Sequence, residues 1–141
     1  MPKTTGSTVK PSPIALVLCD AIYRDETSGK TALVGLFNNI SSRQVPVMHP
    51  RLAVFASVTG LREGSHAKLE IVEAETEQPI ATTSGPFPEG ATPLVVADLS
   101  FVFGNVVFPQ EGLYTVRFWV NDHLLMCRPF RVSVMKQGKK E

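Results

Sequence analysis

The sequence lacks an excess of charge of either sign. It holds 14 basic and 13 acidic side chains, which leave its 141 residues with a formal net charge of +1. Proteins that bind nucleic acid or anionic lipid through their overall field carry a marked basic excess. The near balance argues against such partners, so we expect neither nucleic acid nor a membrane among them.

Long hydrophobic runs are also missing. The first apolar run, residues 14–19, is far shorter than the roughly 18 residues of a membrane span and short even for the core of a signal peptide. The segment 1–12 before it is polar, without periodicity, and typical of a flexible tail. From these features we expect a soluble protein of the cytoplasm.

Cysteine is scarce, and tryptophan occurs once. Cys19 and Cys127 lie far apart in the sequence, each in an apolar run, and they lack the close spacing of a metal site. Two interpretations stay open, namely buried free thiols or a disulfide that joins the first and last strands.

No helical period is present either: no window of about 11 residues repeats apolar side chains at i, i+3, i+4 and i+7. Short apolar or alternating segments separated by Gly, Pro and Asn indicate strands instead. We expect strands at 13–24, 30–38, 51–59, 66–75, 79–84, 94–103 and in a closing pair within 108–134, with loops at 40–50 and 85–90. This pattern predicts an all-β protein, an immunoglobulin-like antiparallel β-sandwich of about eight strands. The domain would span 13–135, between flexible tails at 1–12 and 136–141.

The closing pair gives the clearest signal. Alternation places Tyr114 and Phe118 on one face and Arg117 and Trp119 on the other, and Asn121-Asp122 is suited to the turn between the strands. Pro129 in the last strand predicts a bulge or an unpaired edge.

The segment 111–116, Glu-Gly-Leu-Tyr-Thr-Val, resembles the immunoglobulin-fold segment in which a tyrosine forms a corner. That resemblance implies that the Tyr114 hydroxyl bonds to backbone a few residues upstream. Val116 stands where antibody domains have their second cysteine. We therefore expect an immunoglobulin-like sandwich rather than an antibody-type domain.

Two longer stretches carry a further resemblance. Residues 18–22 and 29–37, together with 108–112, Tyr114 and 129–132, are similar to the opening and closing segments of a family of small bacterial β-sandwich proteins of unknown function. The similarity would cover residues 14–134. It implies a bacterial sandwich and supplies no activity or catalytic residue.

Asp20 is the most suggestive ionisable residue, because its parity with Leu16 and Leu18 points it towards the core. A buried carboxylate could serve as a general acid or base, or be a structural group bonded to backbone amides or an arginine. The role of Asp20 stays open at this point.

The sequence shows no catalytic constellation. His49, His66 and His123 share no ligand spacing, so no metal site is expected. Cys127 with His123 would be separated by about 13 Å along a strand. No nucleophile elbow and no phosphate-binding loop occur. We expect no enzymatic activity and no cofactor.

The expected function is therefore a structural or protein-interaction module that can associate with itself. The candidate surface is Trp119 beside Arg117, as an exposed aromatic anchor, with the loop residues Arg43, Met48 and His49. A strand apolar on both faces near the N-terminus also favours a covered second face. The alternative is a sandwich that binds a small ligand or carbohydrate, with Trp119 as a stacking platform beside that loop. Partner, ligand, pathway and oligomeric state do not follow from the sequence.

Overall fold

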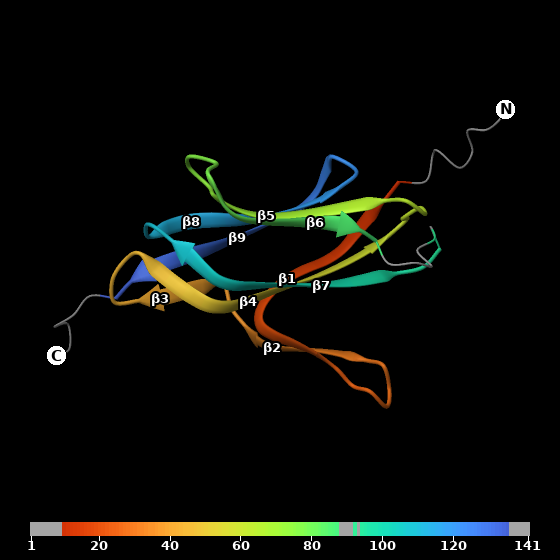
Figure 1. The fold of residues 1–141 in the computed structure, drawn as a ribbon, viewed down its shortest axis with the longest axis horizontal. Coiled ribbons are helices and arrows are strands. Elements are labelled where there is room, and N and C mark those ends of the chain that lie inside the picture. The colour runs from red at the N-terminus through yellow and green to blue at the C-terminus, as the bar shows by residue number, and fades with distance from the viewer. Residues whose placement is uncertain (1–9, 88–91, 93, 136–141) are drawn as a thin grey trace.

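The computed structural model describes residues 10–87, 92 and 94–135 (Figure 1). Nine strands occur in these residues: β1 Ser12–Arg24, β2 Thr31–Leu36, β3 Asn39–Ser42, β4 Val47–Thr59, β5 His66–Glu73, β6 Pro79–Pro86, β7 Ala97–Phe108, β8 Gly112–Val120 and β9 His123–Val134. None of the described residues belongs to a helix of the length and apolarity that crossing a membrane requires. Of the two expected tails, residues 1–9 and 136–141 lie outside the described part, and Ser12 already belongs to β1.

The strands form two layers. A four-stranded sheet has the order β2-β1-β4-β7, and a five-stranded sheet has the order β3-β9-β8-β5-β6. All neighbours are antiparallel except β3 and β9, which run parallel. β4 and β7 take the places of immunoglobulin strands B and E, and β5, β8 and β9 those of C, F and G. The chain is thus an immunoglobulin-like β-sandwich, with nine strands rather than about eight and one parallel pair.

The core lies between the two sheets, where alternate side chains of each strand meet. Its fully buried side chains come from both layers and include Leu18, Leu52, Val54, Val58, Leu69, Ile71, Val116 and Phe118. At one end, the rings of Phe108 and Tyr114 pack edge to face at 5.0 Å, and Phe130 lies 5.8 Å from each. Such aromatic contacts add to the stability that the buried area supplies.

The predicted tyrosine corner is present. The Tyr114 hydroxyl donates a hydrogen bond of 2.6 Å to the carbonyl of Gln110. Tyr114 is fully buried at the start of β8, and this bond ties the strand to the turn before it. Burial raises the pKa of the Tyr114 phenol. The turn at Asn121-Asp122 is also confirmed, with φ of 48° and 69°.

Two predicted boundaries are wrong. The expected loop 40–50 contains β3 and the start of β4, because Asn39–Ser42 pairs with Arg131–Val134 of the last strand. A four-residue strand has no periodicity of its own, so its distant partner decides its conformation. β7 continues through Gly104 and Asn105 to Phe108, and it begins only at Ala97. Asn105 has a φ of 52°, and beyond it the other set of alternate side chains faces the core.

Pro129 lies on an unpaired edge, one of the two possibilities expected for it. β3 pairs only with Arg131–Val134, so at Pro129 the described partner of β9 is β8 alone.

Candidate functional site

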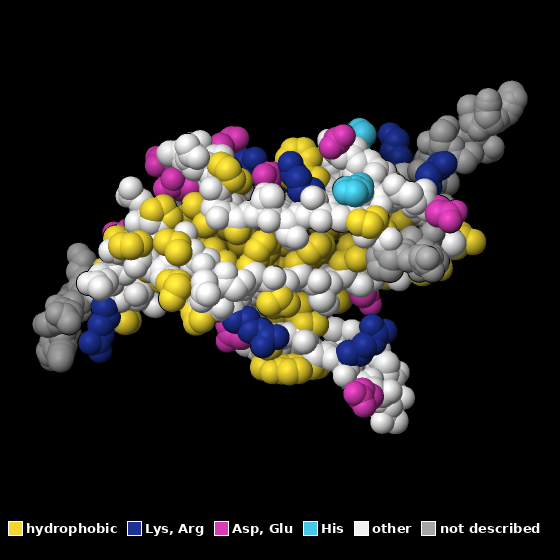
Figure 2. All heavy atoms as spheres, viewed as in Figure 1, with side chains coloured by type: hydrophobic (Ala, Val, Ile, Leu, Met, Phe, Trp, Pro, Cys, Tyr) yellow, Lys and Arg dark blue, Asp and Glu magenta, His cyan; other side chains and the backbone are white. Residues whose placement is uncertain are grey.

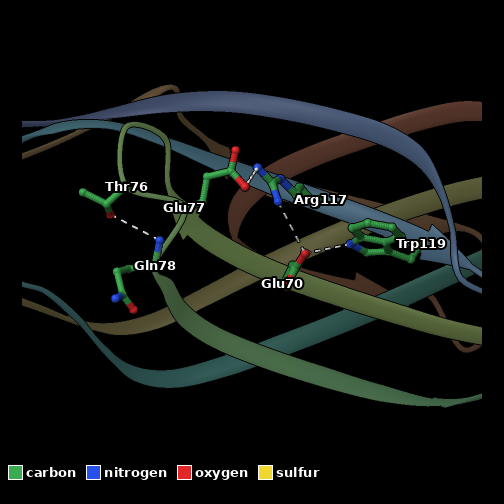
Figure 3. A network of polar contacts seen from close by, with 6 residues as sticks. All are labelled: Glu70, Thr76, Glu77, Gln78, Arg117 and Trp119. Atoms are coloured by element: carbon green, nitrogen blue, oxygen red, sulfur yellow. Dashed lines mark hydrogen bonds and ion pairs between the residues drawn. The ribbon is translucent and has the colours of Figure 1, made fainter.

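The outer face of the five-stranded sheet carries a polar network around Trp119 (Figure 3). Because alternate residues of β8 face the core, Arg117 and Trp119 point outward, opposite Glu70 and Lys68 of β5. The indole N–H donates to Glu70 Oε1 at 2.8 Å. Arg117 Nη1 lies 3.9 Å from that oxygen, and Nη2 lies 3.5 Å from Glu77 Oε1.

Glu70 accepts a hydrogen bond from the indole of Trp119, and Lys68 covers one face of the ring. Trp119 is only half-buried, but its N–H is bonded and Lys68 Nζ lies 5.0 Å from its ring centroid. The Glu70 side chain is 13% exposed, so its charge is shielded and paired with Arg117. A stacking sugar would have to displace Lys68 from the ring face. The arrangement ties β5 to β8 and to the turn before β6.

The other expected surface residues lie elsewhere. Arg43 is in the β3–β4 loop, Met48 is 59% exposed opposite Val107, and His49 is half-buried against the Phe37 ring at 5.6 Å. Trp119 pairs with Leu124 at the start of β9, whereas Ser42, next to Arg43, pairs with Val134 at its end.

The strand between those two points is roughly 34 Å long. The structure therefore brings Trp119 and Arg117 together but separates them from Arg43, Met48 and His49.

Asp20 does not point into the core, contrary to the expectation from parity. Its side chain is 62% exposed, and Oδ1 lies 3.9 Å from His49 Nε2. Beyond Cys19, β1 pairs only with β2 and leaves the sandwich, so the alternation that buries Leu16 and Leu18 no longer applies. Gly35, at a φ of 75°, lies against the Asp20 side chain, where a Cβ would touch the carboxylate. The burial on which an acid–base role depended is therefore missing.

The cysteines are both free. Cys19 is buried, and burial raises the pKa of its thiol, while Cys127 is exposed, which corrects the expectation of two buried thiols. Cys19 is paired with Ala53 in the four-stranded sheet, and Cys127 with Arg117 in the other. A disulfide between the first and last strands is therefore not formed.

The histidines do not converge. His66 and His123 lie near the β8–β9 turn, and His49 lies beside Asp20. Within the described part of the chain, no three His, Cys, Asp or Glu side chains are grouped as a metal site would require.

The most unusual surface of the described residues was not among the surfaces expected from the sequence. The end of β1 and the whole of β2 form a hairpin that projects beneath the sandwich in Figure 1. We call this hairpin, residues 20–36, the arm. Along the arm, Tyr23, Val34 and Leu36 are 56%, 49% and 61% exposed, while Ile22 and Leu33 are half-buried. We call Tyr23, Val34 and Leu36 the apolar stripe. Figure 2 shows hydrophobic side chains on the underside of the arm.

The tip of the arm is fixed by local bonds. Asp25 accepts hydrogen bonds from Ser28 Oγ at 2.8 Å and from the Thr27 amide at 3.1 Å, and these bonds, Ser28 first, lower the pKa of Asp25. Between the arm and the outer face of the four-stranded sheet lies an open cleft of about 640 Å³. Arg24 and Lys30 line it on the arm side, and Phe55 and Asp98 on the sheet side.

One sequence signal did point to the arm. Asp20 and Gly35 interrupt two apolar segments, and they face each other where the arm leaves the sandwich. Side-chain alternation could not predict that the arm leaves the sandwich. It assigns side chains to the two faces of a strand but does not indicate which neighbour covers each face.

Comparison with known proteins identifies a family to which this sequence is similar. The model of a family described as "Family of unknown function (DUF6941)" matches residues 14–133. No curated protein matches.

Several solved structures are similar to this chain, two of them with a TM-score of at least 0.50. They include the alkylpurine DNA glycosylase AlkC of Pseudomonas fluorescens bound to DNA containing an abasic site analog, with a TM-score of 0.51 and 10% identity over 88% of this chain. This chain spans only 30% of that protein. The C-terminal domain of wzt has a TM-score of 0.50 and 12% identity, covering 90% of this chain and 74% of that domain. An immunoglobulin-like protein from Pseudomonas aeruginosa has a TM-score of 0.46 and 9% identity, covering 87% of this chain and 96% of its own. At these identities, the likeness concerns the fold alone.

Proposed function

The chain belongs to this family of unknown function (DUF6941), and we propose that it is a non-enzymatic interaction module whose arm binds the arm of a second copy. The observation that carries the proposal is the apolar stripe. Three large apolar side chains lie about half exposed on a projecting hairpin. Burying apolar surface is worth roughly 25 cal/mol per Å², so such a stripe favours a partner.

The stripe is continuous. Val34 pairs with Ala21 and Leu36 with Cys19, so the two exposed side chains follow each other along β2. Tyr23 pairs with Ala32, one step beyond Val34 towards the tip. β2 has β1 as its only paired neighbour among the described strands, which leaves its second edge open. An open edge and an adjoining apolar stripe are features through which strands associate.

The charges at the tip of the arm favour a second copy of the chain as the partner that covers the apolar stripe. At the tip, the cations Arg24 and Lys30 flank the carboxylates Asp25 and Glu26. A two-fold interface sets the same patch against itself. A tip that carries both signs can then place opposite charges in register, and the net charge of +1 produces little repulsion between copies.

The size of the arm favours a reversible dimer. A stable interface covers about 800 Å² on each partner. A two-stranded ribbon of six residues presents a face of only roughly 200 Å², from strand spacings of about 4.8 Å and rises of about 3.3 Å. The arm alone therefore supports weak association, which we expect in the micromolar range.

The placement of the reactive groups supports the non-enzymatic part of the proposal. Asp20 lies at the base of the arm, Cys127 on the opposite sheet, and His66 and His123 near the β8–β9 turn. These groups do not share a cleft that could hold one substrate.

Sedimentation velocity over a dilution series tests the self-association. The wild type should shift from monomer towards dimer as its concentration rises through the micromolar range. Leu36→Arg should weaken the dimer at least tenfold, because it places a charge in the apolar stripe. Leu113→Arg is the matched control, since Leu113 is 45% exposed on β8, in the other sheet.

Trp119→Ala separates this proposal from the surface expected from the sequence. If the arm is the interface, Trp119→Ala leaves the equilibrium unchanged. A monomeric wild type at all concentrations, or a dimer weakened by Trp119→Ala and not by Leu36→Arg, would overturn the proposal.

A further inference from the structure

A second surface feature lies at the end of the sandwich where β1 begins, whereas the arm lies where β1 ends. There the segment before β1, the β4–β5 turn and the β8–β9 turn enclose a pocket of about 330 Å³. Pockets of this volume fall at the lower end of the range for small-molecule sites. This pocket lies apart from the arm, at the other end of β1.

The pocket has an apolar floor and a cationic rim. Val120, which is 1% exposed, and the half-buried Leu125 contribute to the floor. Lys10 and Arg62 supply the positive charge of the rim, and no acidic side chain of the described residues lines the pocket. Figure 2 shows Lys, Arg and His side chains, with some acidic ones among them, at the end where the described chain begins.

Backbone and side-chain bonds hold the two turns together. The Asn121 amide donates to the His66 carbonyl at 2.9 Å, and the His66 amide donates to Asn121 Oδ1 at 2.8 Å. Ser65 Oγ accepts from the Arg62 amide at 3.2 Å and from Asn121 Nδ2 at 3.4 Å. These bonds form the pocket wall before any ligand arrives, which lowers the entropic cost of binding.

The third wall is set by a close approach of backbone. Gly60 has a φ of 83°, and a Cβ at this position would collide with the carbonyl of Lys10. A glycine therefore lets the segment before β1 lie directly against the end of β4. Through this contact Lys10, like Arg62, lines the pocket.

We propose that this pocket binds a small amphiphilic carboxylate, with its apolar body on Val120 and Leu125 and its anionic group at Lys10 and Arg62. At roughly 30 Å³ for each water-sized group, the volume accommodates about eleven non-hydrogen atoms. A carboxylate with a chain of about eight carbons has this size. Arginine binds such an anion through paired N–H donors, and lysine adds a second positive charge.

Amide-detected NMR titration of the full chain tests the assignment, with octanoate and its neutral isostere octanamide as probes. Octanoate should shift the signals of Gly60, Val120 and His123 saturably and bind at least fivefold more tightly than octanamide. The double variant Lys10→Gln/Arg62→Gln should lose this preference. Arg43→Gln is the matched control, because Arg43 is an exposed arginine near Met135, far from this pocket.

The spectra themselves show whether each variant is folded, and both rim substitutions replace exposed side chains. Equal binding of octanoate and octanamide, a carboxylate preference that survives in the double variant, or no saturable shift with either probe would overturn the proposal.

Discussion

Two hairpins of this molecule are both rich in apolar side chains, and they lie in opposite environments. In the closing hairpin, β8 lies between β5 and β9, and Tyr114, Val116 and Phe118 are fully buried. In the arm, β2 has β1 as its described neighbour, and Val34 and Leu36 remain about half exposed. The difference lies in what flanks each strand rather than in the composition of the strand.

The comparison shows what stabilises the fold and what does not. Alternate side chains of β8, such as Val116 and Phe118, face the other sheet across the core, so removing one leaves a cavity. Side chains of the apolar stripe are about half exposed and lie outside the core between the sheets, so removing one leaves no enclosed cavity. We infer that the closing hairpin supplies stability, whereas the arm supplies a surface.

The largest expected effect is a difference in stability between variants of the two hairpins. Phe118→Ala should lower the free energy of unfolding by about 3–5 kcal/mol, because the ring is fully buried and packs 6.2 Å from that of Phe101. Leu36→Ala should change it by less than about 0.5 kcal/mol at concentrations where the protein is monomeric. Urea denaturation measures both. Similar losses in the two variants would remove the distinction between the hairpins.

A smaller effect concerns the tyrosine corner. Tyr114→Phe should lower the free energy of unfolding by about 1–2 kcal/mol, because the partly buried hydrogen bond from the Tyr114 hydroxyl to the Gln110 carbonyl is lost. The folded-state pKa of Tyr114 is raised above its unfolded value of about 10 by burial. The associated stability is therefore complete below about pH 10 and is lost as pH rises through the folded pKa.

The same variant tests that pH dependence. Burial raises the pKa of the Cys19 thiol as well, so the wild type loses stability on the alkaline side through both groups. Tyr114→Phe should lose less stability than the wild type between about pH 9 and 11, in denaturation measured at each pH. An unchanged alkaline slope would show that the phenol titrates alike in the folded and unfolded chains.

The sandwich could be predicted from sequence because its signals are local. Alternation around Tyr114 and Phe118 marks a half-buried strand, and the spacing of Gly112 and Tyr114 marks the corner. β3 could not be predicted, since Asn39–Ser42 becomes a strand only beside the last residues of β9. The strand expected at 94–103 continues instead through Gly104 and Asn105 to Phe108, because β7 stays paired with β4 on both sides of Asn105.

The candidate surfaces were harder to predict. The outward direction of Trp119 followed from parity, but its bond to Glu70 depends on the register of β5, which the sequence does not fix. The rim of the pocket combines residues such as Lys10 and His123 from opposite ends of the chain. The exposure of Leu36 depends on β1 leaving the sandwich at Asp20, which alternation cannot reveal.

Hydrogen exchange at two protein concentrations tests the central claim, that the arm is an association surface. The amides of β2, Thr31–Leu36, should become more protected as the concentration rises through the micromolar range. Those of β6, Pro79–Pro86, also an edge strand, should not change. Protection of β2 that is independent of concentration, or that rises equally in β6, would contradict the account.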